Sequence, residues 1–350
     1  MGLLSPTSGE LSTFGRQLNN GISLAFDRWN DSGGVNGRRI TWQVYNTDCT
    51  YQAGQQATQQ AIAEGIKFLI GPLCSEAALG AAEVAEAQQV VLIAPTATHP
   101  LVTVAGSGQT RQTVFRVSYA FPQQGLVAAR FARETLALNQ AALLTHPGDD
   151  YATLTHELFA QTFTMTGGQI VYKEAYPSSE AELSLKVTAM VEAGAALIYS
   201  AGPAENVNQL AAQIERLGLS QQIILLGSDR WSEKNPDLPL TTYATRQVFL
   251  AEDNPIAQEW AKTYRATYAL APSTLAVLGY DAADLLGQAL QQAGDFEPLH
   301  VAAALEQNQF DVLTGPLRFD ARHNPLKPMP VVKQQANNLE LMTTFLATNP

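Results

Sequence analysis

The sequence is poor in the features that mark nucleic-acid-binding and membrane-spanning proteins. Its 350 residues include 21 lysines and arginines against 32 aspartates and glutamates, and the formal net charge is −11. No basic patch is visible, which argues against nucleic acid or an anionic membrane surface as a partner. No apolar run is long enough to span a bilayer. The apolar content of 46% and charged content of 15% are instead those of a soluble globular protein.

Motifs for catalysis and for metal binding are missing as well. The five histidines show none of the spacings of a metal site. There is no Gly-x-Ser-x-Gly elbow and no glycine-rich phosphate-binding loop. The sequence also offers no histidine–acid pair for Ser75, the serine of greatest interest below. We therefore expect neither an enzyme nor a bound metal or organic cofactor.

Cysteine is scarce, with only Cys49 and Cys74 in the chain. Each comes just after a predicted strand, so the two thiols can lie at the same edge of one sheet. If they are bridged, the closed loop stabilises the fold by about 3–4 kcal/mol on the chain-entropy model. A bridge would also indicate an oxidising compartment. The alternative is two unpaired thiols in a cytosolic protein, and the residues alone leave both open.

What the sequence does contain is a regular alternation of short apolar runs and helical segments. This rhythm predicts an α/β fold with parallel sheets covered on both faces, and the length predicts two domains. A first series has strands at 3–4, 40–45, 68–70, 90–93 and 113–117, with helices at 15–30, 52–64 and 77–87. A second has strands at 141–145, 170–172, 195–200, 223–226 and 248–250, with helices at 123–138, 151–166, 180–192 and 206–217. An irregular stretch at 229–242 interrupts it. Helices at 256–269, 275–292 and 299–307 and strands at 317–319, 331–333 and 339–342 complete the chain.

One strand-to-helix junction has the chemistry of an anion site. Ser75 stands between the strand at 68–70 and the helix at 77–87, where a serine is a good N-cap. The free N–H groups and the dipole of the first helical turn favour an anion such as a carboxylate. Thr96 and Thr98 follow the next strand at its carboxyl end, where open α/β sheets bind ligands. The alternative is that Ser75 only caps the helix and the threonines only form a turn.

Motifs spread over nearly the whole chain resemble one family, the branched-chain amino-acid binding proteins of bacterial ABC importers. They are LLSPTSG at 3–9, NDSGGVNG at 30–37, DC at 48–49, GPLCS at 71–75, APTAT at 94–98, GYDA at 279–282 and TGPL at 314–317. Each motif is weak alone, but together they occur in the order that the family has. The resemblance implies the type I periplasmic-binding-protein fold, and it pairs Cys49 with Cys74 in a disulfide.

The resemblance also implies how the chain is divided. Two doubly wound, Rossmann-like lobes are expected, joined by three hinge crossovers near 118–121, 250–252 and 322–325. Lobe I would consist of 1–119 plus 252–323, and lobe II of 120–251 plus 324–350. The ligand would lie in the cleft between the lobes.

In the resembled family the α-carboxylate of the ligand is bound at the positions of Ser75, Thr96 and Thr98. The ammonium group is bound by the backbone carbonyl at Thr96 and by an acid of the second lobe, which aligns with Asp229. Relatives often carry Glu there, so the shorter Asp is a departure. Tyr151 aligns with a tyrosine that closes on the ligand. The alternatives are a surface-turn role for Asp229 beside its neighbouring arginine, and helix-start packing for Tyr151.

Three further residues are candidates for the wall of the side-chain pocket. Phe14 aligns with an aromatic residue that walls this pocket in relatives, although it can equally serve as a hydrophobic staple for the helix that follows. Leu73 and Trp231 are the other candidates, with packing in the core or at the surface as the alternative. Tyr280 and Asp281, in contrast, look structural.

The function that the resemblance implies is capture of a small amino acid, most simply a branched-chain aliphatic one, for an ABC importer. The mechanism would be hinge closure on the ligand, by a monomer that is not embedded in the membrane and that docks on the permease subunits. The chain opens within a predicted strand and shows no signal peptide, so a periplasmic or other extracytoplasmic location is implied by the family and the cysteine pair. Two alternatives are an amide-sensing regulator of the same fold and a binding protein for an aromatic acid or urea.

Overall fold

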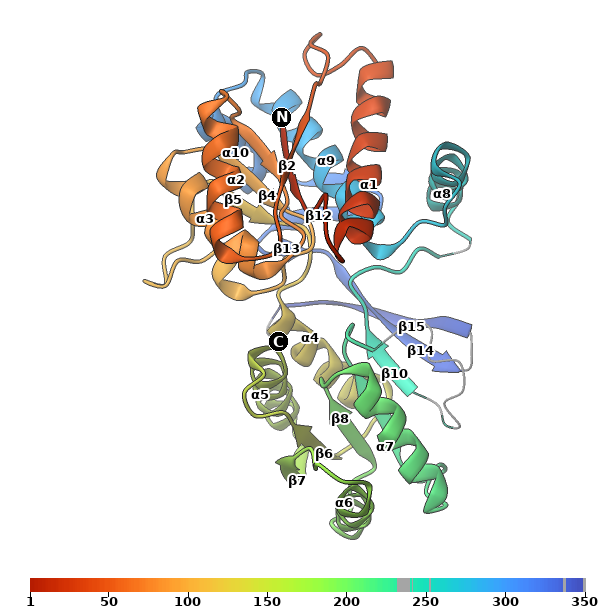
Figure 1. Ribbon diagram of the computed structural model, residues 1–350. Helices are drawn as coiled ribbons and strands as arrows, with labels where there is room; N and C mark the ends of the chain where they lie inside the picture. The colour runs from red at the N-terminus through yellow and green to blue at the C-terminus, as the bar shows by residue number, and fades with distance from the viewer. Residues whose placement is uncertain (232–239, 241, 252, 336–337, 349–350) are drawn as a thin grey trace. The chain divides into compact units, whose positions relative to one another are not determined.

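The computed structural model describes residues 1–231, 240, 242–251, 253–335 and 338–348 (Figure 1). The chain divides into two compact units. Unit 1 consists of Met1–Ala120 and Leu250–Lys327, and unit 2 of Phe121–Phe249 and Pro328–Pro350. The chain therefore passes from one unit to the other three times. The expected boundary at residue 252 lies outside the described residues, as does most of the expected irregular stretch, 232–239 and 241.

The main sheet of unit 1 has five strands that are all parallel, in the order β2-β1-β3-β4-β5. Four of them, all except β2, are buried along their whole length, as expected for a parallel sheet with both faces covered. The strands are β1 (Gly2–Ser5), β2 (Gln43–Asn46), β3 (Phe68–Ile70), β4 (Val91–Ala94) and β5 (Val114–Arg116).

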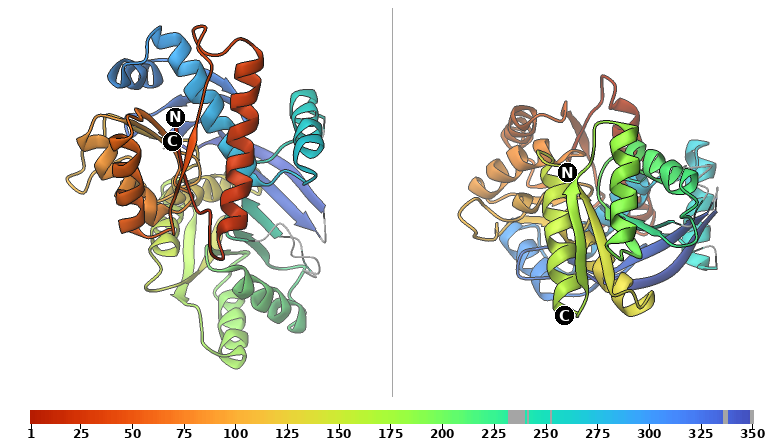
Figure 2. Two further views of the ribbon diagram at one scale, coloured as in Figure 1. Left: turned by 45° about the horizontal axis from the view of Figure 1, so that its top comes forward. Right: turned by 90° about the horizontal axis from the view of Figure 1, so that it is seen from below.

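Helices cover this sheet on two faces. The helices of unit 1 are α1 (Ser12–Asp31), α2 (Tyr51–Ala63), α3 (Ser75–Ala87), α8 (Pro255–Tyr268), α9 (Thr274–Ala293) and α10 (Pro298–Gln307), with a 3-10 turn at Pro100–Val102. α1 lies against α9, far away in sequence (Figures 1 and 2). The approach is close because Gly21 has no side chain; a Cβ there would lie 1.9 Å from the carbonyl oxygen of Ala276. α2 and α3 pack on the other face around a core that includes Leu4, Leu69 and Leu92.

A small antiparallel sheet of β11 (Phe310–Val312), β12 (Gly315–Phe319) and β13 (Pro325–Leu326) completes unit 1. Lys327 follows directly and is only 1% exposed. Its Nζ donates to Oγ1 of Thr314 at 3.0 Å and lies 3.9 Å from Oδ2 of Asp281. These contacts join Lys327, the last residue of the unit 1 segment Leu250–Lys327, to Thr314 and Asp281 of the same unit.

The sheet of unit 2 has seven strands in the order β15-β14-β10-β9-β8-β6-β7. Five of them are parallel, and the last two strands of the chain add an antiparallel edge. The bounds are β6 (Gln140–Thr145), β7 (Gln169–Ala175), β8 (Leu197–Ser200), β9 (Ile224–Gly227), β10 (Thr242–Thr245), β14 (Pro328–Gln335) and β15 (Asn338–Leu346).

Helices lie on both faces of this sheet too (Figures 1 and 2). They are α4 (Phe121–Arg130), continued by a π-helical turn at Phe131–Thr135, and α5 (Asp150–Met165), α6 (Glu180–Glu192) and α7 (Ala204–Arg216). α6 and α7 bury Leu183, Val187 and Ile214 against strand residues such as Ile198 and Leu225. Both units are therefore doubly wound α/β layers, as the alternating pattern predicted.

Two predicted strands differ from the structure. The strand predicted at 248–250 is wrong, because these half-buried residues form no strand and lie where the chain passes between the units. The strand in this region is β10, which pairs with β9 and β14. The strand predicted at 40–45 begins only at Gln43. The N–H and C=O of Ile40 are instead bonded to the side chain of Asn30, at 2.7 and 3.0 Å, so they need no sheet partner.

Candidate functional site

The junction at Ser75 is built differently from the predicted cap. α3 begins at Ser75 itself, and its N-cap is Cys74, whose side chain makes no capping bond. The prediction of Ser75 as N-cap is therefore wrong. Its Oγ accepts instead from the backbone N–H groups of Thr98, at 3.2 Å, and His99, at 3.3 Å. The Ser75 hydroxyl proton has no acceptor among the described residues, so it can be donated to a ligand.

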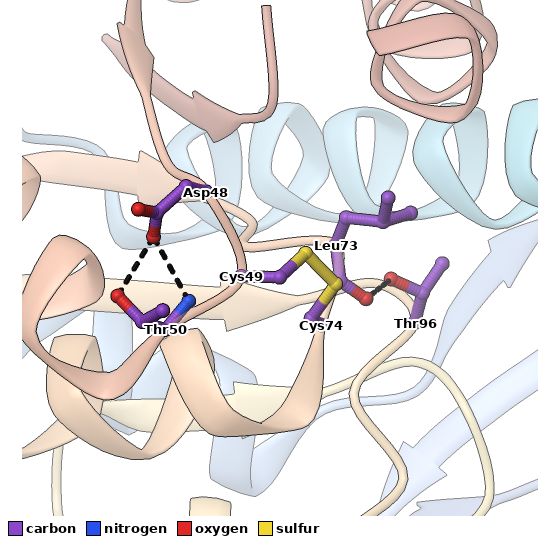
Figure 3. The surroundings of a disulfide bond; sticks show 6 residues. All are labelled: Asp48, Cys49, Thr50, Leu73, Cys74 and Thr96. Carbon is purple, nitrogen blue, oxygen red and sulfur yellow. Dashed lines mark hydrogen bonds between the residues drawn. A yellow bond between two sulfur atoms is a disulfide. The ribbon is translucent and has the colours of Figure 1, made fainter. Parts of the chain in front are cut away.

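A disulfide joins Cys49 to Cys74, with 5.2 Å between the two Cα atoms (Figure 3). The expected pairing is confirmed. Beside it, Oγ1 of Thr96 donates to the carbonyl of Leu73 at 2.7 Å, which ties the loop after β4 to the loop after β3. The bridge and this hydrogen bond fix Cys74 and Leu73, the two residues directly before the start of α3.

The first turn of α3 offers several donors to an anion. The N–H groups of Ser75, Glu76 and Ala77 have no hydrogen-bond partner in the part of the chain that the structure describes. The hydroxyl of Thr98 also has none there, whereas its N–H is already donated to Ser75. Helix-terminal N–H groups and the helix dipole favour a negative charge. This edge of unit 1 can therefore bind a carboxylate without a basic side chain.

The corresponding edge of unit 2 presents an acid held by a tyrosine. Asp229 follows β9, and its Oδ1 accepts from the hydroxyl of Tyr151 at 2.5 Å. Its Oδ2 accepts from Nε2 of Gln247 at 2.8 Å, and its N–H donates to Oε1 of Gln124 at 2.9 Å. Burial, and then the nearby Asp229 charge, raise the pKa of Tyr151 well above its usual value. Tyr151 is therefore a neutral phenol that orients the carboxylate as a donor.

Arg230, the neighbour of Asp229, pairs with a different acid. Its guanidinium carbon lies 3.8 Å from the centroid of the Tyr151 ring, and the guanidinium forms an ion pair with Asp149. Asp149 also caps α5 by accepting from the N–H of Ala152 at 3.1 Å. Because Asp149 offsets Arg230, the Asp229 carboxylate has only neutral donors among its described hydrogen-bond partners. It is suited to a cationic group.

The three wall candidates lie in different surroundings. Phe14, in the first turn of α1, is 46% exposed within the structure. Leu73 is half-buried beside the disulfide. Trp231 is 1% exposed and belongs to the core of unit 2, with its ring over Gly227, where a Cβ would come within 2.0 Å of it. Core packing thus accounts for Trp231, whereas the side chain of Phe14 is exposed.

Sequence reasoning missed two glutamines that position Asp229. Gln124 is fully buried, and its Oε1 accepts both from Asp229 N–H and from the hydroxyl of Thr245, the latter at 2.8 Å. Gln247 comes shortly after the end of β10. Neither has a local signal, because a buried glutamine is indistinguishable in sequence from the many exposed ones in this chain.

Two kinds of feature are absent from the described residues. No group of three or more His, Cys, Asp or Glu side chains lies close enough to hold a metal ion. None of the helices in the described ranges combines the length and apolarity needed to cross a membrane.

Comparisons with known proteins agree with this geometry. A model of the family described as periplasmic binding protein matches residues 1–338. The leucine-, isoleucine-, valine-, threonine- and alanine-binding protein of Pseudomonas aeruginosa is 24% identical over 327 residues, covering 91% of this chain and 85% of that protein.

Solved structures are similar over nearly the whole length. An ABC transporter substrate-binding protein from Desulfitobacterium hafniense, in complex with Leu, has a TM-score of 0.82 at 21% identity and covers 98% of this chain and 99% of that one. A solute-binding protein from R. palustris, in complex with benzoate, has a TM-score of 0.73 at 23% identity and covers 99% and 96%. The fold is thus the type I periplasmic-binding-protein fold that the motifs implied. The chain belongs to the periplasmic binding protein family.

Proposed function

We propose that this protein is an extracytoplasmic solute-binding protein that captures a small aliphatic amino acid, most simply a branched-chain one, for an ABC importer. Family membership supports a binding role, and the relative from P. aeruginosa is named for binding leucine, isoleucine, valine, threonine and alanine. The Cys49–Cys74 disulfide supports an oxidising compartment. The partner would be the permease of the importer, the protein would act as a monomer, and no catalytic step is proposed.

The carboxylate of the amino acid is assigned to unit 1. Its ligands would be the Ser75 hydroxyl, the hydroxyl of Thr98 and the free N–H groups at the start of α3. Together they provide the two or three hydrogen bonds that a carboxylate needs when it leaves water. Thr96 supports the loop through Leu73, and its own carbonyl stays assigned to the ammonium group.

The ammonium is assigned to Asp229 of unit 2, and this carboxylate is the observation that carries the proposal. An α-amino acid is a zwitterion, and a buried ammonium without a counter-charge costs several kcal/mol. Asp229 is held by Tyr151 and Gln247 and is not paired with Arg230, so its charge is available. Phe14 and Leu73 would contact the aliphatic side chain.

Assigning the two charged ends to different units gives the mechanism. Only a ligand that carries both charges would engage both units at once. Such a ligand favours the closed conformation by its higher affinity for it, and the closed form is what the importer would receive.

The test is calorimetric titration of ligand-stripped protein with leucine, isoleucine, valine and phenylalanine, and with the 2-oxo acid of each. The proposal expects an aliphatic amino acid to bind most tightly and its 2-oxo acid, which lacks the ammonium, to bind far more weakly. A 2-oxo acid that binds as tightly as the best amino acid would show that the amino-acid assignment is wrong.

An aromatic acid is the second candidate ligand, since the benzoate-bound protein of R. palustris shares the fold. Benzoate has no group to match Asp229, so the same titration extended to benzoate, urea and small amides separates the candidates. Tight benzoate binding would favour the aromatic-acid reading. Tight amide binding would favour an amide-sensing regulator of the same fold. The disulfide argues against that alternative.

A further inference from the structure

Arg116, the last residue of β5, is fully buried in unit 1. Its Nη2 donates to the carbonyl of Pro100 at 2.9 Å and to Oγ1 of Thr103 at 3.0 Å. Its Nη1 reaches the carbonyl of Ala97 at 3.4 Å. All three acceptors belong to the segment 97–103, which follows β4. Arg116 therefore anchors the loop that brings backbone N–H groups to Ser75.

The charge of this guanidinium has no close counter-ion. No carboxylate lies within 4.0 Å of it among the described residues, and its hydrogen bonds go to carbonyls and a hydroxyl. Burial lowers the pKa of Arg116 to about 9, and the charge of Asp320 acts in the opposite direction. The side chain is thus still protonated at neutral pH. In a low-dielectric interior such a charge acts strongly on the groups bonded to it.

One peptide group connects Arg116 to Ser75. The carbonyl of Ala97 and the N–H of Thr98 belong to the same peptide bond. The carbonyl accepts from Arg116 and, at 3.1 Å, from the hydroxyl of Ser118, while the N–H donates to Oγ of Ser75. Hydrogen bonds linked in this way polarise one another. A positive charge at one end of the chain makes the hydroxyl proton at the other end a stronger donor.

We propose that Arg116 is a positioning residue for the carboxylate site, acting through the Ala97–Thr98 peptide on the hydroxyl of Ser75. The affinity of the site for a carboxylate would thereby be raised by a cation that does not contact the ligand. This inference rests on the proposed function, because it takes Ser75 as a ligand of a carboxylate. It explains how a site made of neutral donors favours an anion.

The test separates the effect of the Arg116 charge on leucine affinity from the effect of a hydrogen bond to the Ala97 carbonyl. Arg116→Gln keeps an N–H donor but removes the charge, Arg116→Lys keeps the charge, and Ser118→Ala removes only the neutral donor to the same carbonyl. Leucine affinity is measured by calorimetry, and thermal denaturation checks that each variant is folded. We expect Arg116→Gln to bind roughly 5- to 30-fold more weakly, at most the loss for removing the Ser75 hydrogen bond through which it acts. Ser118→Ala should lose less than roughly 3-fold, and Arg116→Lys should regain most of the affinity.

Arg133 in unit 2 is the matched control, because it also binds backbone carbonyls, those of Thr166 and Leu138. Arg133→Gln should leave leucine affinity unchanged. The proposal is overturned if folded Arg116→Gln binds leucine as wild type does, or if Ser118→Ala or Arg116→Lys loses as much as Arg116→Gln. If Arg116→Gln does not fold, Arg116→Lys is the deciding variant. It keeps the charge and should bind leucine nearly as wild type does, so a large loss of affinity would overturn the proposal.

Failure of the proposed function would be seen separately, as wild-type protein that binds no amino acid. Arg116 is then judged by hydrogen exchange of the Thr98 and His99 amides in ligand-free protein. Both amides should be protected in wild type and should exchange faster in Arg116→Gln. Equal rates in the two proteins would overturn the inference.

Discussion

The hydroxyl of Tyr151 and Oδ1 of Asp229 are 2.5 Å apart, and the tyrosine is the donor. Gln247 binds the other carboxylate oxygen, so both oxygens are fixed before any ligand arrives. A carboxylate has about four lone-pair sites, so two donors leave room for an ammonium group. The acid is held in one orientation by two neutral groups.

Replacement of Asp229 by asparagine should weaken amino-acid binding by about 2–4 kcal/mol, because the buried ammonium loses its counter-charge. The measurement is calorimetric titration with the best ligand of the panel. Asp284→Asn is the matched control. Asp284 is a buried acid of unit 1 that is bonded to Trp29 and Gln288 and forms an ion pair with Arg28, and its replacement should leave the affinity unchanged. Equal affinities for wild type and Asp229→Asn would refute the assignment.

Replacement of Ser75 by alanine should cost roughly 1–2 kcal/mol of ligand affinity, as for a lost hydrogen bond to a charged group. Two backbone N–H groups also lose their acceptor, so the melting temperature of the free protein should fall slightly. Thr50→Ala is the comparison, because Thr50 is a true N-cap, of α2, accepting from Ala53 N–H at 3.2 Å. It should lower stability by about 1 kcal/mol without lowering affinity. The same pattern in Ser75→Ala would mean that Ser75 is only structural.

These two sites show what the sequence revealed and where it stopped. The strand-to-helix junction was predicted from the pattern, and the pairing of Cys49 with Cys74 from the family resemblance. Tyr151 and Asp229 were each predicted as ligand-binding residues, but the hydrogen bond between them was not. The position of Ser75 in the helix was predicted wrongly, because an N-cap and a first helical residue differ by one position, and only the backbone shows which it is. The polarising role proposed for Arg116 depends on a buried side chain that contacts a loop 13 to 19 residues earlier in the sequence. A contact of that kind leaves no periodic or local signal.

The strand at β10 was missed for a related reason. Its residues 242–245 are only moderately apolar, and the more apolar run at 248–250 attracted the prediction. Pairing with β9 and β14 decides the matter, and such pairing across distant parts of the chain is invisible to local pattern.

Removal of the disulfide by Cys49→Ala with Cys74→Ala should lower the free energy of unfolding by about 3 kcal/mol, since the two residues are 25 apart. The order of ligand preference should not change, because neither sulfur is assigned a ligand contact. Chemical denaturation gives the stability, and mass measurement of the unreduced wild type tests the bridge. Two alkylatable thiols in that sample would contradict the structure.

Acidification should act on His156. Burial lowers its pKa to about 4, with His146 and Lys173 acting in the same direction and Asp149 opposing. Its Nε2 accepts from the N–H of Ala201 at 3.1 Å, which requires that nitrogen to be unprotonated. The unfolded chain takes up the proton near its ordinary pKa of 6.5. Stability is therefore fully present above pH 6.5 and is lost as the pH falls toward 4, by up to about 3 kcal/mol.

The check is the free energy of unfolding of wild type minus that of His156→Gln, measured as a function of pH. The difference removes the contribution of other groups, among them Asp281, whose raised pKa of about 6 acts in the opposite direction. The advantage of wild type over the variant should shrink between pH 6.5 and 4. A difference that is constant with pH would contradict the assignment.

The contact of α1 with α9 has a consequence for biosynthesis. The first helix of the protein packs on a helix that ends at residue 293, so its apolar face stays uncovered until most of the chain has been made. The sheet of unit 2 is completed later still, because its strands β14 and β15 come at the end of the chain. Neither unit can be completed while the ribosome is still early in the message, and both depend on contacts between distant residues, which form slowly. The native packing of both units is therefore completed only after most of the chain has been made.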